Sequence, residues 1–365
     1  MLFPYFFLIY YGYFRYLNWV IVYRELRALL DWLNDILIKA KEMRASDVHL
    51  SCGSPVIYRI DNDIVRIGEE VLTDDRLYPV MRALLPQENL RDPVQDYDFS
   101  YEIPDVSRFR VNVFHQRRGL SITIRLISNV ILDMNTLGLP MELKKVVKKK
   151  NGIFLVTGPT GSGKSTTLAS MIQYINTRMG KHIITLEDPI EFVYENAKSI
   201  IQQREVKNNV RSFKDGIRSA LRQDPDIILV GEMRDLETIS AAISAAETGH
   251  LVFGTLHTNS APKTIDRIID AFPSEQQNQV RTQFASLLVG VLSQQLVKKS
   301  GGKGRAVVTE FLLNNNAISN LIRTEKIHQI ANAMQTGASE GMHTMKSKVD
   351  ELVHKGIISE NHGLD

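Results

Sequence analysis

The stretch Gly158-Pro159-Thr160-Gly161-Ser162-Gly163-Lys164-Ser165 decides how the rest of this 365-residue chain is organised. It matches the phosphate-binding pattern G-x-x-x-x-G-K-[ST] at every fixed position. Backbone N–H groups of such a loop converge on anionic oxygens, so glycines are needed where a Cβ would block the approach. We expect Lys164 to reach the β- and γ-phosphates, and the Ser165 hydroxyl to bind Mg²⁺ at a helix N-terminus. The predicted nucleoside-triphosphate site comprises Gly158, Pro159, Thr160, Gly161, Ser162, Gly163, Lys164, Ser165 and Thr166.

The residues on both sides supply the strand and the helix that this loop requires. Residues 153–157 (IFLVT) are a short apolar run, typical of a buried parallel strand. Beyond the loop, apolar residues recur at helical spacing from Leu168 to Met179, and Gly180 ends the pattern. Strand, loop and helix therefore follow one another as a phosphate site needs.

Three further apolar runs downstream predict strands, and helical patterns separate them: residues 182–186, 226–230 and 251–256. Glu187 follows the first run, Glu232 follows the second and His257 follows the third. Alternating strands and helices predict an α/β fold with a mostly parallel sheet covered on both faces. Ligands bind at the carboxyl ends of the strands in such sheets, so these three side chains are expected beside the phosphate loop.

These side chains suit the hydrolysis of a phosphoanhydride. That reaction needs Mg²⁺ on the phosphates, a carboxylate to orient water and positive charge near the γ-phosphate. Glu232 is the first candidate for orienting water and Glu187 for the shell of Mg²⁺ and water, although the two roles could be exchanged. The predicted metal-binding residues are Ser165, Glu187 and Glu232, and His257 is a candidate sensor of the γ-phosphate.

The chain before and around this core has a simple predicted organisation. Residues 28–128 show short alternating strands and two helical patterns, as in a small α+β domain, and residues 129–140 read as a linker. Residues 141–365 form the nucleotide domain. Within it, a helix is expected from Val280 to Val291, followed by a hairpin whose turn contains 301–304.

Residues 1–27 form an N-terminal extension of a different character, because aromatic residues crowd it and Arg15 is the only charge before residue 24. Three interpretations stay open: a non-native extension from a start codon placed too early, a membrane anchor, or a packed helix.

Overall composition sets limits on partners. The net charge of +3 does not by itself imply a nucleic-acid partner, and the single Cys52 excludes an internal disulfide framework and a four-cysteine zinc site.

The chain resembles a known family of motors. GPTGSGKST, ITLEDPIEF, DPDIILVGEMRDLETI and GHLVFGTLHTNSA match the Walker A, Asp box, Walker B and His box of secretion-superfamily ATPases, of the PilT type that retracts type IV pili. The resemblance implies a PAS-like first domain, a RecA-like second domain and ATP with Mg²⁺. It also implies a cytoplasmic homo-hexamer that works at the inner membrane with the pilus platform protein. Arg110 and Arg125 become candidates for arginines that act on a neighbouring subunit's ATP.

One departure from the family affects the expected motor output. The C-terminal element reads Ala317-Ile318-Ser319-Asn320-Leu321-Ile322-Arg323, with Ser319 where the family usually has arginine. That element is linked to retraction rather than to hydrolysis. A PilU-like accessory ATPase, an assembly or secretion ATPase and a nucleotide-gated scaffold with little turnover therefore remain alternatives.

Overall fold

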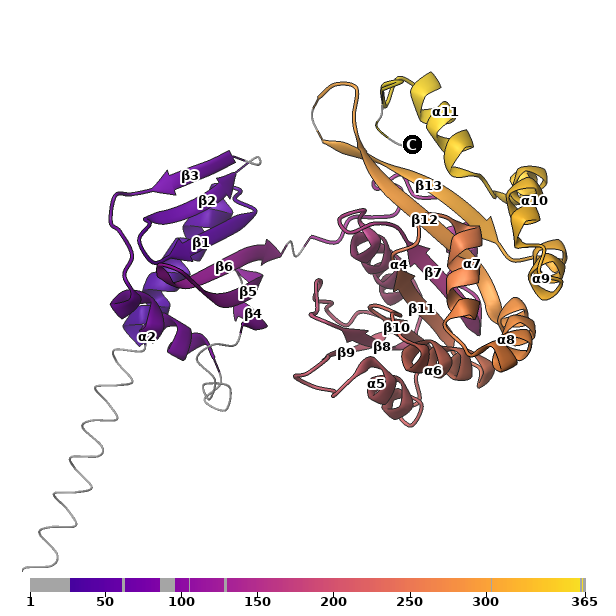
Figure 1. Ribbon diagram of the computed structural model, residues 1–365, viewed down its shortest axis with the longest axis horizontal. Helices are drawn as coiled ribbons and strands as arrows, with labels where there is room; N and C mark the ends of the chain where they lie inside the picture. Colours follow the sequence, from indigo (N-terminus) through magenta and orange to yellow (C-terminus); the bar gives the residue numbers. More distant parts are fainter. Residues whose placement is uncertain are drawn as a thin grey trace, which may run out of the picture. The chain divides into compact units, whose positions relative to one another are not determined.

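The computed structural model describes residues 27–60, 63–85, 96–104, 106–127, 130–302, 304–361 and 363. The chain divides into two compact units, residues 1–129 and 130–365, and each is described by itself (Figure 1). Residues 1–26 lie outside the described part, so the interpretations of the aromatic extension stay predictions. In the described part, no helix has both the length and the apolar character needed to cross a membrane.

The first unit is built on a six-stranded antiparallel sheet in the order β3-β2-β1-β6-β5-β4. Its elements are β1 (Asp47–Ser51), β2 (Val56–Ile60), β3 (Asp63–Ile67), β4 (Tyr97–Ile103), β5 (Ser107–Gln116), β6 (Gly119–Ile127), a helix over residues 27–42 and α2 (Asp74–Leu84). Along β5 every second residue is buried, because successive side chains point to opposite faces. The buried face packs on Leu33, Leu37 and Leu77 of the helices. The result is the α+β architecture that the sequence predicts.

The second unit contains a seven-stranded sheet in the order β13-β12-β7-β11-β10-β8-β9. Its strands are β7 (Gly152–Thr157), β8 (His182–Glu187), β9 (Ile200–Glu205), β10 (Ile227–Val230), β11 (Leu251–Leu256), β12 (Leu288–Lys298) and β13 (Arg305–Leu313). Neighbours are parallel from β12 through β9, and only the edge strand β13 is antiparallel. Every residue of β7, β10 and β11 is buried, since helices cover both faces.

Two layers of helices flank this sheet. The helices of the unit are α3 (Leu143–Val146), α4 (Lys164–Arg178), α5 (Phe213–Ala220), α6 (Leu236–Glu247), α7 (Ala261–Asp270), α8 (Ser274–Leu287), α9 (Asn316–Arg323), α10 (Ile330–Thr336) and α11 (Met345–His354), with single 3₁₀ turns at Ile327–Gln329 and Gly337–Glu340. Met171 and Ile175 of α4 pack on one face, while α5, α6, α7 and α8 share the core of the other. The predicted mostly parallel, doubly covered α/β fold is therefore confirmed.

One predicted element is wrong in its second half. The helix expected from Val280 to Val291 ends at Leu287, and β12 begins at Leu288. Leu288 and Val291 are buried by pairing with β7 instead of by a helical face. A fully buried strand has an apolar run without a period of its own, so the pattern alone did not place this boundary. The predicted hairpin is present, because β12 pairs with β13 across the turn.

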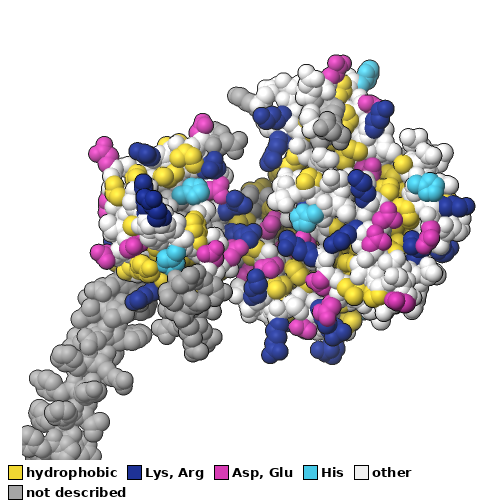
Figure 2. Space-filling model, viewed as in Figure 1, with side chains coloured by type: hydrophobic (Ala, Val, Ile, Leu, Met, Phe, Trp, Pro, Cys, Tyr) yellow, Lys and Arg dark blue, Asp and Glu magenta, His cyan; other side chains and the backbone are white. Residues whose placement is uncertain are grey.

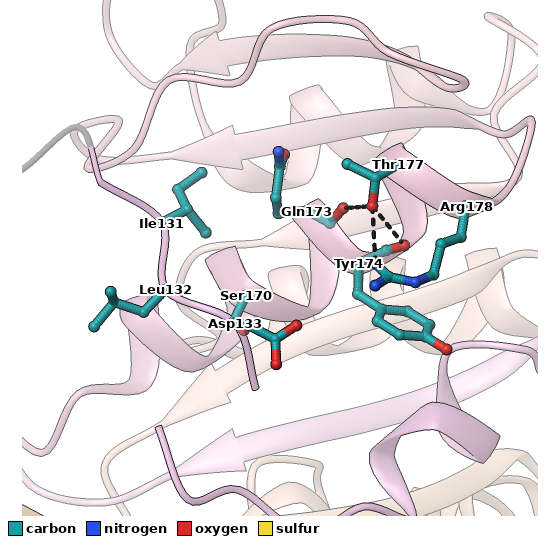
Figure 3. Close-up of a pocket in the computed structure, with 8 residues that line it drawn as sticks. All are labelled: Ile131, Leu132, Asp133, Ser170, Gln173, Tyr174, Thr177 and Arg178. Atoms are coloured by element: carbon teal, nitrogen blue, oxygen red, sulfur yellow. Dashed lines mark hydrogen bonds between the residues drawn. The ribbon is translucent and has the colours of Figure 1, made fainter. Parts of the chain in front are cut away.

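The segment predicted as a linker is packed against the second unit from residue 130 onward. Met134 and Leu139 are buried in the same core as α4. Before them, Ile131, Leu132 and Asp133 run beside α4 and line a cavity of about 520 Å³ with residues of its second half (Figure 3). The residues that line this cavity do not include those of the phosphate loop.

In the lysine-rich stretch at 144–150, the two valines are buried and most of the lysines face solvent. Val146 and Val147 are buried, whereas Lys145, Lys148 and the two lysines that follow are exposed. On the face in view, basic and acidic side chains are interspersed over the second unit (Figure 2).

Candidate active site

The phosphate loop joins the buried strand β7 to α4. Gly158 has a φ of +140°, and a Cβ there would lie 2.2 Å from the carbonyl oxygen of Gln294 on β12. Gly163 precedes α4 with a φ of +89°, in the left-handed region that favours glycine. These two glycines let the loop turn tightly, so that the free N–H groups and positive dipole end of α4 lie at the carboxyl edge of the sheet.

Lys164, the first residue of α4, folds back over the loop. Its Nζ donates hydrogen bonds to the carbonyl oxygens of Gly158 and Pro159, at 2.8 and 3.1 Å. Burial lowers the pKa of Lys164, and the carboxylates of Glu232 and Glu191 act in the opposite direction. The ammonium group is therefore within electrostatic range of Glu232, the predicted water-orienting acid.

Glu232 and His257 meet at the same edge. Their strands β10 and β11 are parallel neighbours, with Val230 opposite Gly254, so the residues that follow them come together. The Nε2 atom of His257 lies 2.8 Å from Oε1 of Glu232. Glu232 retains 22% of its side-chain exposure and His257 retains 44%, so both can be reached from solvent.

Glu187 occupies a different setting, although it ends β8 beside β10. The Thr185 hydroxyl donates a hydrogen bond to its Oε1 at 2.6 Å, and the Gln203 amide donates another at 3.3 Å. Burial raises the pKa of Glu187, and these hydrogen bonds oppose that shift. The structure thus brings Glu232 and His257 together and leaves Glu187 more enclosed.

Three further side chains of the site were not predicted. Arg234 forms an ion pair with Oε1 of Glu232 and leaves 75% of its own side chain exposed. Glu191 acts on the pKa of Lys164 and is exposed. Both follow a predicted acid within four residues, and that proximity was the available signal. Gln294 lies far along the chain, so no local pattern indicated its place beneath the phosphate loop.

The two predicted trans-acting arginines belong to the first unit. Arg110 on β5 stands directly opposite Arg125 on β6, on the face that the helices leave open. The Nε of Arg110 donates to Asp98 at 3.0 Å, and the Nε of Arg125 donates to Asp47 at 2.9 Å. Arg125 still exposes 66% of its side chain. Its guanidinium is therefore oriented by one carboxylate and keeps donors for another group.

The residues of the loop fit the phosphates of a nucleotide with Mg²⁺. The buried Ser162 Oγ has no hydrogen-bond partner among the described residues, and Lys164 supplies a cation beside it. In the described ranges, no group of three or more His, Cys, Asp or Glu side chains is arranged to hold a metal.

A buried strand, a glycine-rich loop and a helix N-terminus, with acids on the neighbouring strand ends, define a P-loop nucleoside-triphosphatase. Within that class, the chain belongs to the family of Type II/IV secretion system proteins, whose model matches residues 24–362.

Two curated relatives and one solved structure refine this placement. The chain is 48% identical over 332 residues to the type IV pilus retraction ATPase PilT of Pseudomonas aeruginosa, covering 90% of this chain and 96% of that protein. It is 34% identical over 325 residues to the type IV pilus ATPase PilU of the same organism, covering 88% and 85%. A crystal structure of the pilus retraction motor PilT with bound ADP matches with a TM-score of 0.85 at 44% identity, covering 90% of this chain and 95% of that one. The predicted resemblance to PilT-type ATPases is confirmed.

Proposed function

We propose that this chain is a Mg²⁺-dependent ATPase motor that powers the retraction of type IV pili. The observation that carries the proposal is the Glu232–His257 pair at the sheet edge, with Lys164 of the phosphate loop in electrostatic range of Glu232. The higher identity to PilT than to PilU supports the retraction role.

Each residue of the site has one proposed task. Lys164 and the N-terminus of α4 hold the β- and γ-phosphates, and Ser165 binds the metal. When bound, Mg²⁺ neutralises phosphate charge. Glu232 orients the attacking water and accepts its proton, because it is the more accessible acid. Glu187 serves the outer shell of metal and water, because hydrogen bonds from Thr185 and Gln203 hold its Oε1 at the end of β8. His257 reports the state of the γ-phosphate through its contact with Glu232.

We propose further that the protein works as a cytoplasmic homo-hexamer at the inner membrane. In this arrangement Arg110 and Arg125 of one subunit reach the γ-phosphate bound by its neighbour, and the platform protein of the pilus receives the motion. The first unit, with its antiparallel sheet and helices on one face, is assigned to the PAS-like class. Residues 129–140 connect it to the RecA-like ATPase domain.

Complementation tests this function. The gene is expressed in a type IV piliated bacterium that lacks its retraction ATPase, and twitching is scored beside ATP turnover of the purified protein. We expect both activities from the natural chain and neither from Lys164→Ala. Turnover without any retraction would contradict the motor assignment, and retraction by Lys164→Ala would contradict its dependence on ATP.

An accessory role is the second candidate, and Ser319 favours it. The Ser319 side chain is buried, and its hydroxyl, with one proton to donate, lies 2.9 Å from the carbonyl oxygen of Ala285 and 3.0 Å from Asn314 Oδ1. Helix α9 is thus tied to α8 without the arginine usual in this family. A protein that restores twitching only beside a second retraction ATPase would be accessory, and ATP binding with negligible turnover would indicate a scaffold.

A further inference from the structure

The β12–β13 hairpin contacts both loops of the proposed ATPase site. Ser293 is paired with Glu310 and Gln294 with Thr309, so each pair shares one face of the sheet. Gln294 is two residues from Leu292, which packs in the core of α4, so it lies on the α4 face. Glu310 is two residues from Leu312 in the opposite core, so it lies on the α7 face. One hairpin therefore presents a polar side chain to each helical layer.

Gln294 supports the phosphate loop from beneath. Its Nε2 donates a hydrogen bond of 2.7 Å to the carbonyl oxygen of Ser162, and its side chain is 1% exposed. The backbone carbonyl oxygen of Gln294 lies so close to residue 158 that only a glycine fits there. Next to it, Ser293 Oγ lies 2.7 Å from Thr157 Oγ1, at the end of β7. These contacts fix the path of the loop against β12 on both sides of its turn.

Glu310 supports the loop that carries His257. This glutamate is 8% exposed, and its Oε1 accepts a hydrogen bond of 2.6 Å from the N–H of Ala261, the first residue of α7. Ala261 directly follows the loop 257–260. The Oε2 atom of Glu310 accepts a second hydrogen bond, of 3.3 Å, from the N–H of Met345, the first residue of α11. A single carboxylate thus accepts hydrogen bonds at the N-terminal ends of two helices; burial raises its pKa, and these two hydrogen bonds oppose that shift.

We propose that the hairpin sets the geometry of the ATPase site, with Gln294 as the positioning residue of the phosphate loop and Glu310 as that of the His257 loop. The inference rests on the proposed roles of Lys164 and His257. Because Gln294 acts on the groups that bind phosphates in the ground state, its loss weakens nucleotide binding. Glu310 holds the loop that carries His257, and His257 contacts Glu232, the proposed water-orienting acid. The loss of Glu310 therefore slows the chemical step. Through Met345, Glu310 also connects α11 to that step.

The first arm of the test compares Gln294→Leu with Gln295→Leu. The two glutamines are neighbours on β12, but Gln295 is half-buried and points to the other face. Gln294→Leu leaves the Ser162 carbonyl without its donor, so we expect the KM for ATP and the Kd for ADP to rise about tenfold. For Gln295→Leu, the KM for ATP and the Kd for ADP are expected to stay within about twofold of the natural values, because this side chain does not contact the phosphate loop through a hydrogen bond in the described structure. Equal nucleotide binding by the two variants would overturn the role of Gln294.

The second arm compares Glu310→Met with Thr309→Val. The Thr309 hydroxyl lies 2.9 Å from Nε2 of His343, and among the described residues it forms no hydrogen bond with α7 or the His257 loop, so Thr309→Val perturbs the same strand while leaving the Glu310–Ala261 hydrogen bond in place. Glu310→Met removes both acceptors, and kcat is expected to fall about tenfold at an unchanged KM. Glu310→Gln keeps one acceptor oxygen and should lie between. Unchanged kcat in folded Glu310→Met protein, or an equal loss in Thr309→Val, would overturn the role of Glu310.

Reference variants separate this inference from the proposed function. Thermal melting gives the folded fraction of every variant, so that kcat refers to folded protein. If Lys164→Ala and His257→Ala lose turnover while the hairpin variants lower only the melting temperature, the positioning roles are wrong and the site stands. If Lys164→Ala and His257→Ala keep natural turnover, the site assignment fails and the positioning roles fail with it.

Discussion

The sheet of the first unit buries one face, whereas the sheet of the second unit buries both. In β5, buried and half-buried residues alternate, so Arg110 and Asn112 stand on an open face along the strand. In β7 and β11 every position is buried. Polar groups of a doubly covered sheet can meet a ligand only where the strands end, which is where Glu232 and His257 lie. The comparison teaches that the second unit presents polar side chains where its strands end, whereas the first unit presents them along an open face of its sheet.

The largest effect on ATP hydrolysis is expected from a change at the carboxyl edge of the second unit's sheet. Lys164→Ala removes the cation nearest the phosphates, so hydrolysis should fall by more than about 10³-fold. The fold should persist, because no core side chain is lost. A coupled assay of phosphate release, with a melting curve as control, measures both. Turnover equal to that of the natural chain would show that the phosphate site is wrongly assigned.

A stability experiment sharpens the contrast between the two sheets. Phe253 on β11 is fully buried and packs edge-to-face on Phe154, so Phe253→Ala should cost about 3–5 kcal/mol of unfolding free energy. Thr123 stands on the open face of β6, and Thr123→Ala should cost less than about 1 kcal/mol. Urea denaturation of the two variants gives the difference. Similar losses of unfolding free energy in the two variants would contradict the difference in burial between the two sheets.

Glu232→Gln separates binding from chemistry at the edge. The amide keeps the size of the side chain but cannot accept the proton of water, so kcat should fall about 10²-fold or more while ATP binding is retained. A fluorescent ATP analogue measures the Kd beside the turnover assay. If binding is lost instead, Glu232 is chiefly a metal-shell residue, and Glu187 becomes the better candidate for water activation.

The open face of the first unit should matter only in the assembled protein. Arg125→Ala and Arg110→Ala are expected to lower turnover about 10- to 100-fold with little change in ATP affinity, because an arginine at the γ-phosphate acts on the transition state. Turnover per subunit should also rise with protein concentration as rings form. Arg66→Ala, at an exposed position of β3, is the matched control and should be neutral.

Mixing experiments decide whether these arginines act across subunits. An arginine variant mixed with Lys164→Ala protein should regain some activity, since mixed rings contain interfaces with both an intact loop and an intact arginine. Full turnover from a demonstrably monomeric sample would refute a trans arginine. Full turnover in both single arginine variants would show that other residues fill the role.

The smallest effect is expected at the N-terminal extension. A protein that starts at Arg27 should be soluble and keep its ATPase activity, because every candidate site residue lies at position 110 or later and residues 1–23 carry only Arg15 as a charge. Turnover and a thermal melt of this shortened chain measure the effect. Loss of the cooperative transition would mean that the extension is packed structure.

Much of the second unit could be predicted because its signals are local. The phosphate loop, its strand and its helix are contiguous, and an acid or histidine follows each of three apolar runs within two residues. Parallel pairing then forces Glu232 and His257 to one edge. The boundary at Leu288 was missed because a buried strand and a buried helix share an apolar composition. The sequence predicted Glu187 at the carboxyl edge of the sheet, where the structure has it. No sequence pattern indicated that Thr185 and Gln203 would enclose it.

The sequence by itself therefore determined the fold class, the phosphate loop and which strand ends carry chemistry, since these depend on hydrophobic period and on residues adjacent in the chain. Only the tertiary structure decided which side chains meet. Gln294 reaches Ser162, and Glu310 joins Ala261 to Met345, across separations that no periodicity spans. Such contacts arise when a hairpin adds to a distant strand, and strand order is fixed by packing of the whole sheet rather than by any local segment.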